Sequence, residues 1–340
     1  MPGTKEGGFL KKVITYIIIT AFLFGTMEIA LKIGGSAFDP LQLTFLRFFI
    51  GGLVLAPVGI AEARRHQIRI STKEFIWLLL VGIMGIAISM LCFQLGVERC
   101  NAATAAALMC LNPLFTMVIA HIFTSEKMDR AKGIAFAIGI MAAVFMIRPW
   151  DVQEGNTVLG MILMLVATTT FAAYTVMGKR TISRLGTFTQ TSLSFILGSL
   201  ALLVVIVATG RPVVHNITVA PLELLYCGVV VTGLGYMFYF LAIKYSDATT
   251  GSIAFFIKPA IAPVLAVLIL HETVYWNTIV GIALLIGASI ITLRDTWKNK
   301  DTSIEATEEH DRETFEKVRE DLEKDLEHHG VRGGAGTERI

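Results

Sequence analysis

Residues 101–126 read NAATAAALMCLNPLFTMVIAHIFTSE, and residues 247–272 read DATTGSIAFFIKPAIAPVLAVLILHE. Each stretch begins with a polar residue, continues with small residues, carries a proline near its middle and ends on a glutamate. The two stretches lie 146 residues apart, and eight of 45 positions are identical when residues 82–126 are aligned with residues 228–272. The ordered set of features, more than the number of identities, predicts an internal duplication.

The composition around these stretches is that of a membrane protein. Of 340 residues, 54% are apolar and only 16% are charged, against about a quarter in soluble domains. Residues 1–294 carry a net charge of +8, whereas residues 295–340 carry −6. This pattern excludes a water-soluble enzyme and a disordered or fibrous chain, and it predicts a polytopic membrane protein with a solvated acidic tail.

Apolar segments long enough to cross a bilayer, about 20 residues, alternate with short charged breaks. The expected spans are residues 13–33, 41–60, 75–95, 102–122, 131–147, 157–177, 188–209, 221–243, 250–270 and 276–293. We therefore expect an all-α protein of ten transmembrane helices. Its parts are a cytoplasmic N-terminus (1–12), two five-helix repeats (13–147 and 157–293) and a charged cytoplasmic tail (294–340).

The distribution of Lys and Arg predicts the orientation. With the N-terminus inside, 17 of these residues fall in cytoplasmic segments and four on the opposite side, which places both termini in the cytoplasm of a plasma-membrane protein. Because five is odd, the second repeat enters the membrane from the opposite side. Inverted repeats are typical of secondary transporters with a site near the midplane. The alternative is a duplication that built a scaffold without transport.

The sequence also resembles a known family, the EamA-type transporters of the drug/metabolite transporter superfamily. The resemblance rests on Leu46-Arg47, on the block at 101–126, on its counterpart at 235–272, and on the glycine-rich segments AKGIAFAIGIMAAV and IVGIALLIGASII. It covers residues 13–293 and implies ten spans and transport of small metabolites, among them amino acids, amines and sugar phosphates. The first family span often carries Trp-Gly, where this sequence has Phe24-Gly25.

Three charges lie inside the expected spans, where charge is costly and often functional: Glu28, Arg47 and Lys258. Glu28 and Arg47 lie roughly 8 and 9 Å from the outer end of adjacent antiparallel spans, at a rise of about 1.5 Å per residue. They can therefore form a structural ion pair. Glu28 has a second interpretation, as a group that binds substrate or a coupling proton.

Lys258 lies roughly 12 Å into its span, and its repeat counterpart Asn112 roughly 15 Å into the other, each immediately before a proline. Pro113 and Pro259 should each free a backbone carbonyl, which is tolerated at depth only beside protein or a water-filled cavity. We expect Lys258 and Asn112 to mark a central polar site, with Lys258 binding a substrate carboxylate or phosphate or acting as a titrating group. A snorkelling or backbone-capping lysine is the alternative.

Aromatic and amide side chains are expected to line that site, although packing alone would also account for them. They are Tyr174, Tyr236, Tyr239 and Gln94. Glu126 and Glu272 close their spans near opposite surfaces, where anchoring or gating is expected, and Arg47 is assigned a structural or gating role. The four cysteines match no metal-ligand spacing and are interpreted as core residues.

The function predicted from these observations is a secondary transporter, in the export direction, for small polar metabolites such as amino acids, related amines or organic acids. The alternatives are an intramembrane enzyme, a multidrug or sugar-phosphate carrier of the same superfamily, and a channel or receptor. The spans contain no H-E-x-x-H, G-x-S-x-G or G-x-x-x-x-G-K-[ST] motif. We therefore expect no enzyme activity, no cofactor, no metal and no nucleic acid, but a small-molecule substrate in a lipid bilayer. Proton coupling and an oligomer remain open.

Overall fold

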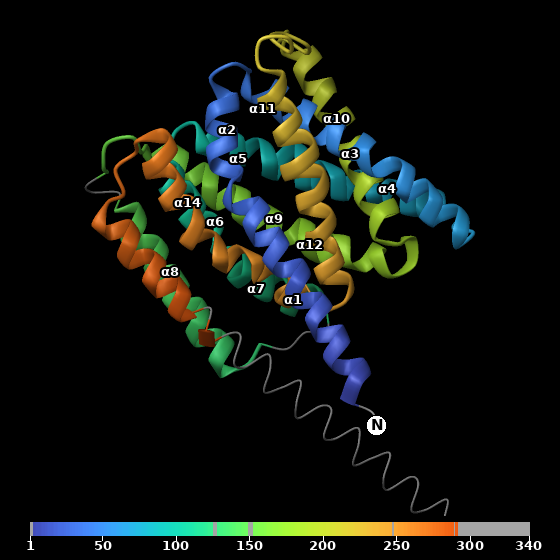
Figure 1. Cartoon of the computed structure of the whole chain (residues 1–340), viewed down its shortest axis with the longest axis horizontal. Coiled ribbons are helices and arrows are strands. Elements are labelled where there is room, and N and C mark those ends of the chain that lie inside the picture. Colours follow the sequence, from blue (N-terminus) through green and yellow to red (C-terminus); the bar gives the residue numbers. More distant parts are fainter. Residues whose placement is uncertain (1–2, 125–127, 149–151, 247, 289, 292–340) are drawn as a thin grey trace, which may run out of the picture. The chain divides into compact units, whose positions relative to one another are not determined.

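The computed structural model describes residues 3–124, 128–148, 152–246, 248–288 and 290–291, which belong to one compact unit (Figure 1). Every regular element in these ranges is helical. Glu126 and the charged tail from residue 294 onward lie outside the described residues, and so does Asp247.

Eight helical segments are long and apolar enough to cross a membrane, and two shorter ones accompany them. The eight are Lys11–Gly35, Pro40–Arg65, Thr72–Val97, Ala102–Phe123, Arg130–Ile147, Val158–Leu185, Thr187–Ala208 and Pro221–Lys244. The two shorter segments are Ile261–Leu270 and Trp276–Ala288. They correspond in order to the ten expected spans, so the expected all-α polytopic fold is confirmed.

Several spans consist of more than one helix. In the first half the elements are α1 (Gly3–Gly25), α2 (Met27–Gly35), α3 (Pro40–Arg65), α4 (Thr72–Gly82), the π-helix η1 (Ile83–Met90), α5 (Leu91–Val97), α6 (Ala102–Met109), α7 (Asn112–Phe123) and α8 (Arg130–Ile147). In the second half they are α9 (Val158–Leu185), α10 (Thr187–Ala208), α11 (Pro221–Leu225), the π-helix η2 (Tyr226–Leu234), α12 (Gly235–Lys244), α13 (Ala248–Ser252) and α14 (Ala254–Leu270).

The irregularities repeat in the two halves. The π-helices η1 and η2 occupy the third and eighth spans at nearly the same register, and the fourth and ninth spans are both divided in two. The first span is divided at Thr26, whereas its counterpart α9 is continuous. The halves are therefore related but not equivalent, and the difference lies in the span that carries Glu28.

The prolines do not act as symmetrically as the sequence predicts. Pro113 stands in the first turn of α7, directly after the interruption at 110–111, where its missing N–H leaves no bond unmade. In the second half the interruption falls at Ile253, and α14 runs past Pro259. The helix is thus interrupted six residues before Pro259 and continues through it, because a helix tolerates the loss of one donor when its neighbours pack against it.

The two halves interlock around the core. α1 of the first half packs along α12 and α14 of the second, and α9 of the second half packs along η1, α5 and α7 of the first. α3 and α10 lie against each other and against the two π-helices. Figure 1 shows α1, α9, α12 and α14 converging in the middle of the bundle. The buried volume between the halves therefore receives side chains from both.

Candidate functional site

A buried ion pair joins the two halves. Glu28, in the first turn of α2, and Lys258, in α14, are both fully buried, and Lys258 Nζ lies 2.5 Å from Glu28 Oε1. The ammonium also lies 5.7 Å from the ring centre of Phe93 and 5.5 Å from that of Phe255, within cation–π range. Two opposite charges, each costly in an apolar interior, therefore stabilise each other at this point.

The ion pair between Glu28 and Arg47 that the sequence allowed is not formed; Glu28 pairs with Lys258 instead. The reason is a long-range contact. A Cβ on Gly25 would lie only 2.9 Å from Ile261, so the first span and α14 approach closely just before the break at Thr26. That approach, together with the length of the lysine side chain, brings Lys258 to Glu28.

Arg47, in α3, is fully buried and has no counter-ion within hydrogen-bonding distance among the described residues. Its guanidinium carbon lies 4.4 Å from the ring centre of Phe48, and none of its three side-chain nitrogens hydrogen-bonds to a described residue. Within the same described residues Glu28 Oε2 also lacks a partner. Because an unsatisfied buried charge costs several kcal/mol (of order 3–5), these groups are suited to a polar ligand.

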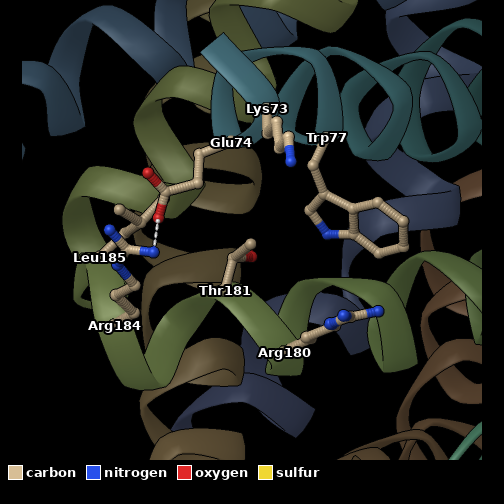
Figure 2. A pocket seen from close by; sticks show the side chains of 7 residues that line it. All are labelled: Lys73, Glu74, Trp77, Arg180, Thr181, Arg184 and Leu185. Atoms are coloured by element: carbon tan, nitrogen blue, oxygen red, sulfur yellow. Dashed lines mark ion pairs between the residues drawn. The ribbon is translucent and has the colours of Figure 1, made fainter. Parts of the chain in front are cut away.

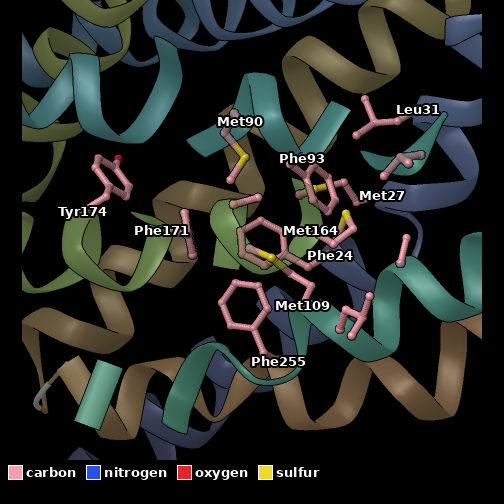
Figure 3. Close-up of a cluster of buried hydrophobic side chains, with 14 of the residues drawn as sticks. Phe24, Met27, Leu31, Met90, Phe93, Met109, Met164, Phe171, Tyr174 and Phe255 are labelled. Atoms are coloured by element: carbon pink, nitrogen blue, oxygen red, sulfur yellow. The ribbon is translucent and has the colours of Figure 1, made fainter. Parts of the chain in front are cut away.

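Aromatic side chains from both halves gather beside the ion pair. Phe24 lies 4.9 Å from Tyr236, 5.9 Å from Tyr239 and 5.5 Å from Phe255, measured between ring centres. Phe171 completes the group at 5.5 Å from Phe255. Figure 3 shows Phe24, Phe171 and Phe255 together with methionines that include Met109 and Met164. The aromatic side chains expected near the site are thus closely packed against one another, and their role as a substrate lining stays a prediction.

The two central tyrosine hydroxyls have partners inside this cluster. Tyr236 donates to Met90 Sδ at 3.1 Å, and Tyr239 shares a 2.8 Å hydrogen bond with Thr175. Met90 and Tyr236 lie 146 residues apart, so this contact joins equivalent positions of the two repeats. Tyr174 packs between Phe171 and Phe240, with ring centres 5.5 and 5.4 Å away.

Asn112 and Gln94, which were predicted from the sequence to lie at the central site, form hydrogen bonds to neighbouring helices and loops. Asn112 Nδ2 donates to the Thr168 carbonyl at 3.3 Å, and its Oδ1 accepts from Thr116 at 3.3 Å, so this amide serves to join α7 to α9. Gln94 donates to Glu98 at 3.2 Å, and the place beside Tyr236 is taken by Met90. Burial raises the pKa of Glu98, just beyond the third span.

A second link between the halves lies at Glu272, directly after α14. Its Oε1 pairs with Lys32 Nζ at 2.5 Å, and its Oε2 accepts from the Ala102 backbone N–H at 2.6 Å. Glu272 therefore caps α6 and holds α2 at the same time. Asn101, the polar residue that begins the stretch at 101–126, makes no side-chain cap bond, and its Nδ2 donates to the Glu154 carbonyl at 3.0 Å. Glu126, the repeat counterpart of Glu272, lies outside the described residues.

Some features of the site were not predicted from the sequence. Phe93 and Phe255 were not distinguished from core aromatics, and Lys32 was not connected with Glu272. One available signal was the paired appearance of Lys32 and Glu272 at ends of spans that the predicted topology places on one side. Among the described residues, no group of three His, Cys, Asp or Glu could hold a metal ion.

Ten helical segments in two related halves, with charges buried where the halves meet, define a polytopic membrane protein with an internal polar site, the architecture of secondary transporters. The chain belongs to the EamA-like transporter family, whose model matches residues 11–148 and again residues 158–294. The family and the names of its relatives indicate a transporter and not an enzyme.

Two relatives that cover most of this chain carry the name uncharacterized transporter. An uncharacterized transporter of Clostridium kluyveri is 34% identical over 86% of this chain and 96% of its own length. The uncharacterized transporter YoaV of Bacillus subtilis is 25% identical over 82% of this chain and 95% of its own. A solved structure described as "Crystal structure of protein" has a TM-score of 0.62 at 17% identity, covering 83% and 96% of the two chains, and supports the fold.

Proposed function

We propose that this protein exports small polar metabolites, with amino acids as the first candidates, by alternating access around the cluster of Glu28, Arg47 and Lys258. The observation that carries the proposal is that these three ionisable groups are fully buried between the halves of a transporter fold. Charges in such a position are retained at a cost in stability, which favours a functional role. Family membership adds to the argument by indicating transport.

The arrangement of the charges suggests the substrate class. With Lys258 held by Glu28, the unpaired guanidinium of Arg47 is the better anchor for a carboxylate, for which its planar fork of donors is suited. Glu28 Oε2 is an acceptor for an ammonium group. A zwitterion meets both needs, and the nearby rings of Phe24 and Tyr236 offer an apolar surface for the rest of the solute.

Alternation requires contacts that close one end at a time. We assign this role at one end to Glu272, which holds Lys32 and the start of α6 together across the two halves. The positive-inside distribution favours this end outside the cell and both termini in the cytoplasm, and we assign the chain to the plasma membrane. We also propose that the chain is divided into a cytoplasmic N-terminus (1–12), two five-helix repeats (13–147 and 157–293) and a charged cytoplasmic tail (294–340).

The test is flux of radiolabelled solutes into proteoliposomes that contain the full-length protein. We expect amino acids to be transported, and we expect Arg47→Gln and Lys258→Ala each to abolish the flux. Arg47→Lys should retain a small part of the wild-type flux, because lysine keeps the positive charge but lacks the planar pair of guanidinium donors. Arg69→Gln, an exposed arginine outside the cluster, is the matched control and should transport like the wild type.

Two outcomes would contradict the proposal, and a third measurement tests proton coupling separately. Flux of cationic drugs or sugar phosphates without amino acids would replace the substrate class with one of the other cargoes of the superfamily. Unchanged flux in both Arg47→Gln and Lys258→Ala would remove the central site. For proton coupling through Glu28, flux should depend on pH in the wild type and lose that dependence in Glu28→Gln; an unchanged profile would leave Glu28 only its structural pair.

A further inference from the structure

A second polar site lies between α4 of the first half and α9 of the second, and it includes neither Glu28 nor Lys258. It is a pocket of about 400 Å³ lined by Lys73, Glu74, Trp77, Arg180, Thr181, Arg184 and Leu185. Figure 2 shows the side chains of α4 facing those of α9 across it. Neither the transport proposal nor the family assigns a role to this pocket.

The pocket has an excess of positive charge. Lys73, Arg180 and Arg184 contribute three cations, against one carboxylate from Glu74. Glu74 is already engaged, because it accepts from the Ser71 backbone at 2.8 Å and pairs with Arg184 at 2.9 Å. A ligand here would thus meet a surplus of cations, and an anion is favoured.

The lining also offers hydrogen-bond donors that are ready for use. The Trp77 indole N–H is buried and has no partner among the described residues. Its ring lies 5.3 Å from the Arg180 guanidinium carbon, a cation–π contact that keeps Arg180 at the pocket wall. Two guanidinium groups, an ammonium and an indole N–H match the several acceptor oxygens of a phosphate group better than the two of a carboxylate.

The surroundings indicate that the phosphate belongs to a lipid. Ile76 and Leu80 follow Lys73 on the same face of α4 at helical spacing, and their side chains are about half exposed (51% and 48%). A molecule with its head at Lys73 and Arg180 could therefore extend apolar chains along Ile76 and Leu80. Tryptophan is typical of the membrane–water interface, and basic pockets between transmembrane helices bind anionic lipid headgroups.

We propose that this pocket binds the phosphate headgroup of an anionic phospholipid, in the leaflet that the Lys/Arg distribution makes cytoplasmic. The proposal stands independently of the transported substrate. Because α4 belongs to the first repeat and α9 to the second, a bound lipid bridges the two halves at this end.

The experiment uses the fluorescence of Trp77 as the reporter. The full-length protein with Trp150, Trp276 and Trp297 replaced by Phe is titrated in detergent with phosphatidylglycerol or phosphatidylcholine whose acyl chains are brominated, and quenching is measured. We expect phosphatidylglycerol to quench at roughly ten-fold lower mole fraction, since each cation near a lipid surface contributes about 1 kcal/mol. Arg180→Gln/Arg184→Gln should remove that preference.

Arg64→Gln/Arg65→Gln is the matched control, because it removes two exposed positive charges from the same predicted side without touching the pocket lining. It should retain the preference. If the pocket double variant fails to fold, Lys73→Gln, at an exposed position in the first turn of α4, should reduce the preference several-fold.

The proposal is overturned if both lipids quench equally, or if the pocket variants keep the preference of the wild type. A third arm adds glycerol phosphate, which carries the same phosphate chemistry without acyl chains. Displacement of phosphatidylglycerol by millimolar glycerol phosphate would show a site for a soluble phosphate, and would overturn the lipid assignment. None of these results depends on whether amino acids are transported.

Discussion

At the scale of single residues, the pairing of Glu28 with Lys258 balances a large desolvation cost against a short charged hydrogen bond. Both side chains are fully buried, and the pair is surrounded by the rings of Phe93 and Phe255. A buried ion pair is often no more stable than an apolar pair of the same size, but removal of one partner strands the other charge. The two effects can be separated by a double-mutant cycle.

We expect Glu28→Gln and Lys258→Met each to destabilise the protein by about 3–5 kcal/mol, and the double variant Glu28→Gln/Lys258→Met to recover most of that loss. Equilibrium unfolding in mixed micelles measures the free energies. Glu154→Gln, which removes an exposed carboxylate, should change stability by less than about 0.5 kcal/mol. Strictly additive losses in the cycle would mean that the two charges do not depend on each other.

At the scale of elements, the helices approach most closely at glycines where the repeats meet. A Cβ on Gly82, at the end of α4, would lie 2.4 Å from the Ser194 carbonyl oxygen and 2.8 Å from the Gly198 backbone nitrogen of α10. These obstacles are backbone atoms that cannot rotate away. In the other half, a Cβ on Gly228 of η2 would lie 2.9 Å from Ile50. Close packing of the π-helical spans is therefore a property of both repeats.

Gly82→Ala should therefore destabilise the protein by about 1–3 kcal/mol, because the added methyl group forces α4 and α10 apart. Gly133→Ala provides the matched control. Gly133 lies in α8 with open space around its Cβ direction, so alanine should stabilise that helix by up to about 1 kcal/mol. The comparison is made by thermal unfolding in one detergent. This account of the packing would be contradicted if Gly82→Ala left the stability unchanged, or if Gly82→Ala and Gly133→Ala changed it in the same direction and by the same amount.

The helices could be predicted where residues within the segment itself, or in the loops beside it, determine where the helix begins and ends. Long apolar segments between charged loops identified the ten spans, and even the short span at 131–147 appears as α8, capped by Asp129 through the Lys132 backbone N–H. The break at Thr26 and the displaced interruption at Ile253 were not predictable, because no Pro or charge marks them. Beside the break at Thr26, a Cβ on Gly25 would contact Ile261, which lies 236 positions further along the chain.

The site was predictable only in part, for the same reason. Glu28, Arg47 and Lys258 could be selected one by one, since charge is rare in an apolar span. Their pairing could not, because neighbouring spans suggested Arg47 for Glu28 whereas the close contact of Gly25 with Ile261 supplies Lys258. Gln94 is a similar case, because its amide donates to Glu98 while Met90, a side chain of the same span, contacts Tyr236.

At the scale of the whole molecule, the two halves are held together by unequal contacts. The Glu28–Lys258 pair is buried inside, and Glu272 contacts Lys32 and the Ala102 N–H at one end, where we have proposed a closing contact. Alternating access requires that the closing contact break while the fold persists. Cys100 is placed to report this change. It is fully buried two residues before the start of α6, and burial raises the pKa of its thiol to about 11.

Glu272→Gln keeps an acceptor for the Ala102 N–H but loses the charge that holds Lys32. We expect the variant to open at this end and Cys100 to react with a membrane-impermeant maleimide at least about ten-fold faster at neutral pH, since the thiolate is the reactive form and its pKa falls towards 8.5 on exposure. The rate is measured on intact cells, with Cys92, Cys110 and Cys227 replaced by Ala so that Cys100 is the single thiol.

The pH profile distinguishes opening from a general loosening of the fold. While Cys100 stays buried, its labelling rate should rise about ten-fold per pH unit up to pH 10, because the pKa near 11 is not yet reached. In Glu272→Gln the rise should level off above a pH of about 9. Glu223→Gln, which removes a carboxylate at the start of the eighth span, should label like the wild type. If Glu272→Gln shows the wild-type rate and profile, the contact with Lys32 anchors the helices without gating them, and closure must then depend on contacts deeper between the halves.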